Sequence, residues 1–172
     1  MQTFVPVSDS YAASVAVLDR SRLGKQRVET LQLITAITGL AFPNAREIAA
    51  GHEPGRIFDR GPKRAWQRHP AALMWSQDVF GLVCYQRATC AEWANRGHKD
   101  TCLEKTEALL DEFSQRRTFS LSEWPNWWGD ERVHDSHKAN LVRKDPGLYG
   151  PMWYDVEPAE GYFWPTYLKE TG

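Results

Sequence analysis

Residues 18–34 constrain the fold of this chain most strongly, because they repeat with the period of an α-helix on two different faces. The apolar stripe of this segment continues to Ile37 and contains Leu23, Leu31, Ile34 and Ile37. The polar stripe contains Arg22, Lys25, Gln26 and Glu29. An amphipathic helix must bury its apolar stripe against other elements, so this segment predicts a helical core. Glu29, the one carboxylate of the polar stripe, is a candidate for chemistry.

The rest of the chain also follows helical spacing. We predict helices over residues 11–19, 18–38, 45–50, 71–96, 102–116 and 130–144. Gly39 and Gly97 suit helix ends, and Pro146 cannot continue a helix. No segment shows convincing strand alternation, and there is no internal repeat. The expected fold is therefore all-α: a compact helical bundle forming a single domain over residues 1–172, with an irregular basic insert and an aromatic C-terminal tail.

The insert covers residues 42–70 and is broken by prolines and glycines. It is long for a plain connection, which favours a functional loop. Within residues 56–68, Asp59 is the only carboxylate, and the cations are Arg56, Arg60, Lys63, Arg64 and Arg68.

Charge distribution limits the class of partner. The net charge of −1 argues against nonspecific binding of polyanions by the whole surface, but the clustered cations leave room for one nucleic-acid face. No apolar run is long enough to span a bilayer, and no signal peptide is evident, so we expect a cytoplasmic protein. The three cysteines are odd in number and lie in helical patterns, which favours reduced thiols.

Glu29 is the first candidate for catalysis. A carboxylate flanked by cations can stabilise an oxocarbenium-like centre or move a proton at a sugar oxygen. The alternative is an ordinary surface ion pair between Lys25 and Glu29.

The cations beside Glu29 are candidates for DNA phosphates, and they are Arg20, Arg22, Lys25 and Arg27. The alternative is a solvated helix face. Arg27 falls on the apolar side, so it should be paired internally or line a cleft. Lys25 is also a candidate Schiff-base nucleophile.

A second polar stripe lies on the helix predicted over residues 130–144. His137, Asn140 and Lys144 share one face, and Arg143 adjoins it. These four residues are candidates for contacts to a nucleic-acid backbone, with an ordinary exposed face as the alternative.

Two other residue groups carry less chemistry. Cys84, Cys90, His98 and Cys102 lack the short spacings of a zinc site, so buried thiols are favoured and no metal is expected. The tryptophans of the 122–129 loop, and Trp153 with Tyr154, can stack on bases, although core packing explains most tryptophans.

Three segments resemble a known family. They are Leu18-Asp-Arg-Ser-Arg-Leu-Gly-Lys-Gln-Arg-Val-Glu29, Arg96-Gly-His-Lys-Asp-Thr101 and His137-Lys-Ala-Asn-Leu-Val-Arg-Lys-Asp-Pro146. They are similar to bacterial relatives of bacteriophage endonuclease V, a pyrimidine-dimer DNA glycosylase with AP lyase activity. Trp153-Tyr154 resembles the aromatic tail of the phage enzyme.

The resemblance implies a helical fold that acts on double-stranded DNA with a damaged or modified base, without cofactor or metal and as a monomer. In the family an N-terminal α-amine attacks the sugar C1′, a helix glutamate assists, and a Schiff base leads to β-elimination. Aligned without gaps from Leu18, that glutamate falls on Glu29. Met1, Gln2 and Thr3 are then the candidates for the nucleophile. Gln2 is bulky for efficient removal of Met1, so lyase activity is left open, and an activated water is an alternative nucleophile.

The expected function is thus excision of a modified pyrimidine from duplex DNA. Two alternatives stay open: a noncatalytic nucleic-acid-binding module of the same fold, and a helical scaffold with solvated charges. Salt-dependent DNA binding without turnover would favour the module.

Overall fold

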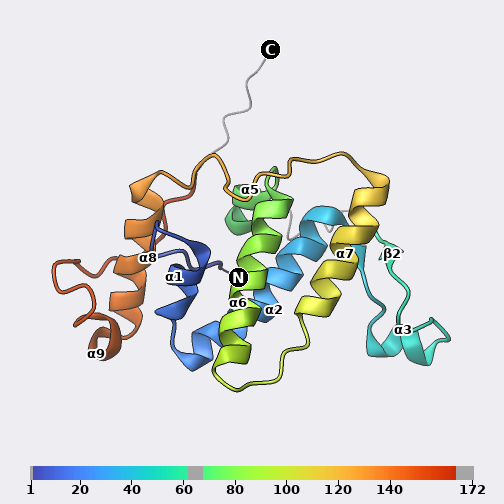
Figure 1. Ribbon diagram of the computed structural model, residues 1–172, viewed down its shortest axis with the longest axis horizontal. Coiled ribbons are helices and arrows are strands. Elements are labelled where there is room, and N and C mark those ends of the chain that lie inside the picture. Colours follow the sequence, from blue (N-terminus) through green and yellow to red (C-terminus); the bar gives the residue numbers. More distant parts are fainter. Residues whose placement is uncertain (1, 62–67, 166–172) are drawn as a thin grey trace, which may run out of the picture.

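A computed structural model describes residues 2–61 and 68–165 (Figure 1). Met1, Lys63 and Arg64, which the sequence singled out, lie outside these residues. The helices are α1 (Tyr11–Ala16), α2 (Arg20–Thr38), α3 (Ala45–Ala49), α5 (Pro70–Trp75), α6 (Val79–Asn95), α7 (Leu103–Arg116), α8 (Glu131–Lys144) and α9 (Pro146–Tyr149). The described part is mostly helical. The expectation of an all-α fold needs one correction, a two-stranded antiparallel sheet of β1 (Leu40–Ala41) and β2 (Phe58–Asp59).

Helix α2 forms the centre of the packing. The Asp19 side chain caps its first turn by accepting from the backbone of Ser21 and Arg22. Gly39 ends it in the left-handed conformation, with φ of 76°, which glycine adopts without steric cost. Its apolar side packs on α6, and it also contacts α5 and α7. The predicted end of this helix at Gly39 is confirmed.

The prediction of one continuous helix over residues 71–96 was wrong. The chain breaks at residues 76–78 and forms α5 and α6 instead. The Ser76 hydroxyl donates to the carbonyl of Leu73, and Asp78 leaves the helical conformation before α6 begins. Neither residue is a strong helix breaker, and both segments carry apolar residues at helical spacing, so the periodicity did not reveal the break.

The described part of the insert, residues 42–61 and 68–70, contains more regular structure than its composition suggested. Asn44 and Glu47 form a capping box at the start of α3. Arg60 lies close to Glu47, and its backbone N–H donates to the carbonyl of Gly39. Figure 1 shows α3 and β2 at the opposite end of the molecule from α8 and α9. Part of the positive charge of the insert is therefore neutralised locally.

Helix α8 is followed at once by the short helix α9, which the sequence analysis did not predict because Pro146 was treated only as a stop. Proline suits the first position of a helix, and the Asp145 side chain caps α9. The chain then returns along α8, where the Ala159 N–H donates to the carbonyl of Ala139 over 3.4 Å. The segment around Ala159 therefore lies along α8.

Candidate active site

The N-terminal segment, residues 2–5, runs among α2, α6 and α8 (dark blue in Figure 1). The Phe4 N–H donates to the Gln26 side chain over 3.0 Å, and the Tyr85 hydroxyl donates to the Phe4 carbonyl over 2.9 Å. The Val5 N–H donates to Nδ1 of His137 over 2.8 Å. Because these groups are buried, each lost hydrogen bond would leave a desolvated polar atom. The segment therefore has one well-defined position.

This segment ends on Glu29. The backbone nitrogen of Gln2 donates to Oε2 of Glu29 over 3.0 Å. The Gln2 side chain is buried, while Glu29 is only partly buried. The charge of Glu29 also affects His69. Burial lowers the pKa of His69, and the negative charge of Glu29 opposes that shift. The fold thus places a main-chain nitrogen from the start of the chain against the carboxylate of a helix.

Glu29 lies between two hollows of the surface. The smaller has a volume of about 380 Å³, and its lining includes Gln2, Lys25, Lys144 and Tyr162. The larger, of about 910 Å³, runs along α2 and is lined in part by Arg20, Val28 and Trp93. Both volumes fall in the range of ligand-binding clefts. Because Glu29 and Lys25 line both hollows, they form the wall between them.

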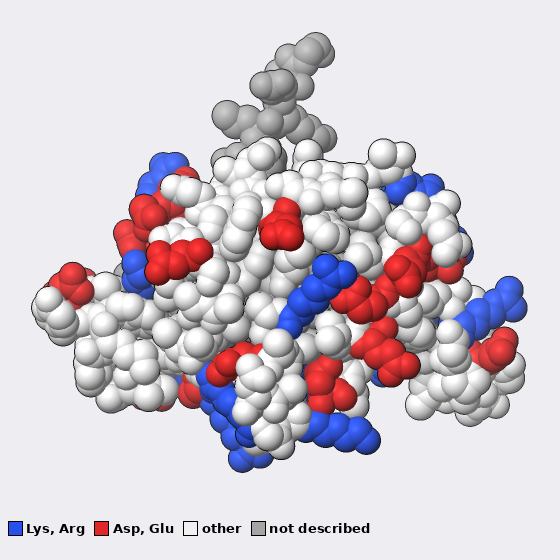
Figure 2. All heavy atoms as spheres, viewed as in Figure 1, with Lys and Arg blue, Asp and Glu red and all other residues white. Residues whose placement is uncertain are grey.

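Several predicted cations do border these hollows. Lys25 lines both, and within residues 2–61 and 68–165 it makes no ion pair. The expected alternative, a surface pair of Lys25 with Glu29, does not form. Lys144 lines the smaller hollow, and partial desolvation together with Arg143 and Arg22 lowers its pKa. Figure 2 shows blue and red interleaved on one face, so no single sign of charge covers it.

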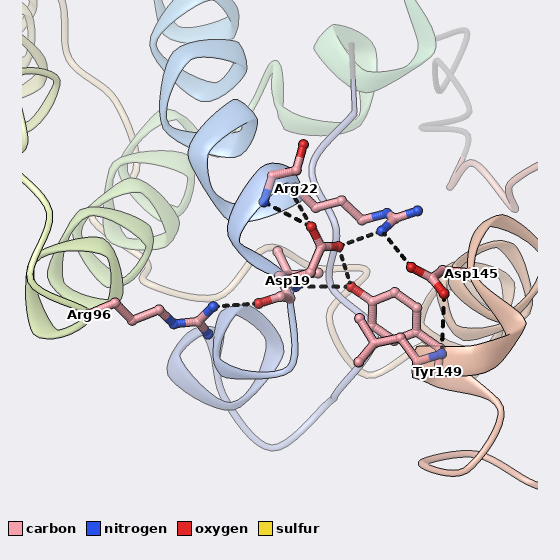
Figure 3. Close-up of polar contacts among 8 residues, drawn as sticks. Asp19, Arg22, Arg96, Asp145 and Tyr149 are labelled. Atoms are coloured by element: carbon pink, nitrogen blue, oxygen red, sulfur yellow. Dashed lines mark hydrogen bonds and ion pairs between the residues drawn. The ribbon is translucent and has the colours of Figure 1, made fainter.

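Arg22 is held in a polar network (Figure 3). It pairs with Asp19, lies 3.8 Å from a carboxylate oxygen of Asp145, and sits over the ring of Tyr149. The Tyr149 hydroxyl donates to Asp19 over 2.9 Å. Burial acts to raise the pKa of Asp19, but the hydrogen bonds from Arg22 and Tyr149 outweigh it and hold that pKa below its ordinary value. This network ties the start of α2 to the α8–α9 junction.

A second arginine, Arg96, supports the connection between α1 and α2. Figure 3 shows Arg96 pointing to the chain just before α2, where its guanidinium donates to the carbonyls of Leu18 and Ala16.

Arg27 lies in neither hollow. It pairs with Asp100, and its guanidinium sits 4.4 Å from the ring centre of Trp93. The sequence predicted that Arg27 is either paired internally or lines a cleft, and the structure shows it paired. Its charge therefore links α2 to the turn before α7. Arg27 is thus removed from the cations predicted to contact DNA phosphates.

The expectation for the stripe on α8 needs correction. His137 and Asn140 are buried, so they neither form an exposed face nor reach a nucleic-acid backbone. Burial, with a smaller contribution from His134, lowers the pKa of His137 to about 3, so the ring is neutral. Because its Nδ1 accepts from the Val5 N–H, the proton of the neutral ring lies on Nε2. Asn140 donates to the carbonyl of Gly161. His137 thus holds the N-terminal segment, and Asn140 holds the returning chain at Gly161.

The described residues contain no group of three or more His, Cys, Asp or Glu that could hold a metal ion. Cys90 and Cys102 are buried, Cys84 is partly buried, and burial raises the pKa of all three thiols. Across the same residues, no helix combines the length and apolar character needed to cross a bilayer.

Sequence reasoning gave no role to three residues around the site. Gln26 was placed only on the polar stripe, Tyr85 was not noted, and Tyr162 was counted as part of an aromatic tail. The hydrogen bonds of Gln26 and Tyr85 to the N-terminal segment depend on contacts between distant parts of the chain. The helical position of Gln26, beside Glu29, is the only sequence signal that could have suggested a role for one of these three residues.

Comparison with known proteins gives one match. A family model described as pyrimidine dimer DNA glycosylase matches residues 1–106. This span contains the N-terminal segment, α2 and the Arg27–Asp100 pair, but not α8 or the C-terminal tail. No curated protein and no solved structure matches the chain.

Proposed function

The chain belongs to the pyrimidine dimer DNA glycosylase family, and we propose that it excises a damaged or modified pyrimidine from duplex DNA by attack of a terminal amine on the sugar C1′. The observation that carries this proposal is the contact of 3.0 Å between the Gln2 nitrogen and Glu29 Oε2. If Met1 is removed, this nitrogen becomes the α-amine, and an amine and a proton acceptor within hydrogen-bond distance are the minimal pair for this chemistry.

The proposed reaction begins with a neutral amine. Its lone pair forms a bond to C1′ while the C1′–N1 bond breaks and leaves its electron pair on the pyrimidine. Glu29 takes the proton that the nitrogen loses, and it stabilises the positive charge that develops at the sugar. The C1′–O4′ bond then breaks: the nitrogen lone pair forms the C=N bond of the Schiff base, and O4′ takes the proton that Glu29 holds. Loss of the 2′ proton from that intermediate would cleave the strand by β-elimination, which is the AP lyase activity of the proposal.

Several groups are candidates for the nucleophile of this reaction. In the chain as written, the Gln2 nitrogen belongs to a peptide bond, so attack from its position requires removal of Met1. If Met1 is retained, the α-amine is that of Met1. Thr3 is a poor candidate, because it is buried with its hydroxyl accepting from Trp75. Lys25, which lines both hollows, and an activated water are the remaining alternatives.

The cations around the hollows suit the phosphates that flank the reacting nucleotide. Lys25 and Lys144 border the smaller hollow, Arg20 lines the larger, and Arg143 is exposed next to Lys144. Binding through such contacts should weaken as salt rises, because each neutralised phosphate releases counterions.

Borohydride trapping tests the proposal. The substrate is a duplex oligonucleotide with one cyclobutane pyrimidine dimer, and the mature N terminus is first identified by intact mass. Base release is scored after photoreversal of the cyclobutane ring, because the dimer keeps the cleaved pyrimidine bonded to its neighbour. We expect base release and a covalent adduct whose peptide map places the DNA on the N-terminal peptide. An adduct on Lys25 would reassign the nucleophile, and base release without adduct would indicate water. Absence of both base release and adduct would refute the enzymatic proposal.

A further inference from the structure

Tyr162 lies outside the part of the chain that the family model matches, yet it lines the smaller hollow with Glu29. Its ring packs edge-on against His137, with 5.2 Å between ring centres, and against Phe4 at 6.3 Å. Both partners belong to the group of residues that positions the N-terminal segment. Tyr162 is therefore held against the same framework that places the Gln2 nitrogen on Glu29.

The segment that carries Tyr162 is anchored on both sides. Before it, Asn140 donates to the carbonyl of Gly161. After it, the ring of Phe163 lies 4.3 Å below the guanidinium of Arg132. Anchors on adjacent residues restrict the backbone, so the position of Tyr162 at the hollow is a consequence of the fold.

The hydroxyl of Tyr162 is available for a ligand. Within the described residues it has no hydrogen-bond partner, although the other phenols near the site do: Tyr85 donates to Phe4, and Tyr149 donates to Asp19. Burial raises the pKa of Tyr162 to about 12, outweighing the opposing effect of Arg143 and Arg22. At neutral pH the phenol is therefore protonated and can donate.

We propose that Tyr162 donates a hydrogen bond to the departing pyrimidine. This inference rests on the proposed glycosylase function and extends it to the leaving group. When the C1′–N1 bond breaks, its electron pair leaves with the base, and the negative charge is shared with the carbonyl oxygen O2 next to N1. A donor aimed at that oxygen stabilises the charge without transferring its proton. The cations of the hollow suit phosphates, whereas a neutral phenol suits a base.

The test compares the two reactions of one protein. Full-length wild type and Tyr162→Phe are assayed under single-turnover conditions on a duplex with one cyclobutane pyrimidine dimer and on the same duplex with an abasic site. A hydrogen bond to a charged group corresponds to a change of roughly 10- to 100-fold in rate. We expect Tyr162→Phe to slow base release by that factor and to leave Schiff-base formation at the abasic site unchanged, because no base departs there.

A neighbouring variant serves as the matched control. Glu157→Gln alters an exposed residue of the same tail that lines neither hollow, so its rate of base release should equal that of wild type. Equal base release by wild type and Tyr162→Phe would overturn the inference. Equal slowing on both substrates would also overturn it, because Tyr162 would then act by positioning the nucleophile. A wild-type protein that releases no base would refute the proposed function, and the inference with it.

Discussion

Helices α2 and α8 carry similar polar stripes, but they use them differently. On α2, Lys25 and Glu29 line the hollows and face the solvent side of the site. On α8, His137 and Asn140 are buried and hold the N-terminal segment and the returning C-terminal tail. The sequence analysis treated both stripes as candidates for DNA contact. The difference shows that the side chains of a polar helical stripe can form hydrogen bonds to the protein's own backbone and need not face a ligand.

The physical reason lies in what each stripe faces. The N-terminal segment has no regular partner strand or helix, so its buried N–H and C=O groups need side-chain partners. His137 on α8 and Gln26 on α2 supply them. Within α2 the division is sharp, because buried Gln26 precedes partly exposed Glu29 by three residues. The comparison predicts that changes on the exposed stripe alter chemistry and that changes on the buried stripe alter stability.

The largest expected effect comes from Glu29→Gln. Removal of a proton acceptor should slow base release by roughly 10²- to 10⁴-fold. Folding should change little, because Glu29 is partly exposed and glutamine keeps an oxygen for the Gln2 N–H. Single-turnover rates and urea unfolding measure the two quantities. Glu131→Gln, an exposed carboxylate at the start of α8, is the control and should match wild type. An active Glu29→Gln protein would remove Glu29 from the mechanism.

The next effect is on stability. His137→Ala leaves the Val5 N–H without its buried acceptor and opens a cavity, which together should lower the free energy of unfolding by about 2–4 kcal/mol at pH 7.5. Urea unfolding measures this loss. DNA affinity at a temperature where the variant remains folded should be close to that of wild type. A variant of normal stability and weakened DNA binding would contradict the assignment of His137 to structure.

The pH dependence of this effect has a defined sign. The pKa of His137 is about 3 when folded and about 6.5 in an unfolded chain, so on acidification the unfolded state takes up the proton first. The stabilising contribution of neutral His137 is complete above pH 6.5. Below that, it should fall by about 1.4 kcal/mol per pH unit. The stability gap between wild type and His137→Ala should therefore narrow between pH 6.5 and 5; a constant gap would contradict burial of a neutral ring.

The smallest effect is on binding. Lys25→Ala should weaken binding to undamaged duplex DNA several-fold and lower the slope of log affinity against log salt by about one unit. The matched control is Lys138→Ala on α8, because Lys138 pairs with Asp135 and lines neither hollow. Fluorescence anisotropy at several salt concentrations measures both. An unchanged slope for Lys25→Ala would place the DNA elsewhere on the surface.

Local sequence signals predicted much of the fold. The helix ending at Gly39, the short helix after Asn44 and the helix ending at Lys144 have caps or stops that act within one turn. The break between α5 and α6 and the pairing of β1 with β2 were missed. The pairing of β1 with β2 joins separate segments of the chain, and the break lies at Ser76 and Asp78, which are not strong helix breakers, so periodicity over a short window contains neither.

The site was predicted in part. The helical pattern singled out Glu29, and the resemblance assigned it a role beside the N terminus. Burial reversed the expectations for His137 and Asn140, since a polar residue on a helix looks the same in sequence whether it faces water or a buried backbone. Tyr162 reaches the hollow only because the tail doubles back along α8.

The sequence by itself determined the helical character of the chain, the ends of α2 and the choice of Glu29, because these follow from side chains within a few turns of one helix. Tertiary structure alone decided that the Gln2 nitrogen meets Glu29, that Arg27 is paired with Asp100, and that α8 holds Val5 and Gly161. Contacts of this kind join residues that are distant in the chain. They form only where the packing of the core leaves a buried polar group in need of a partner.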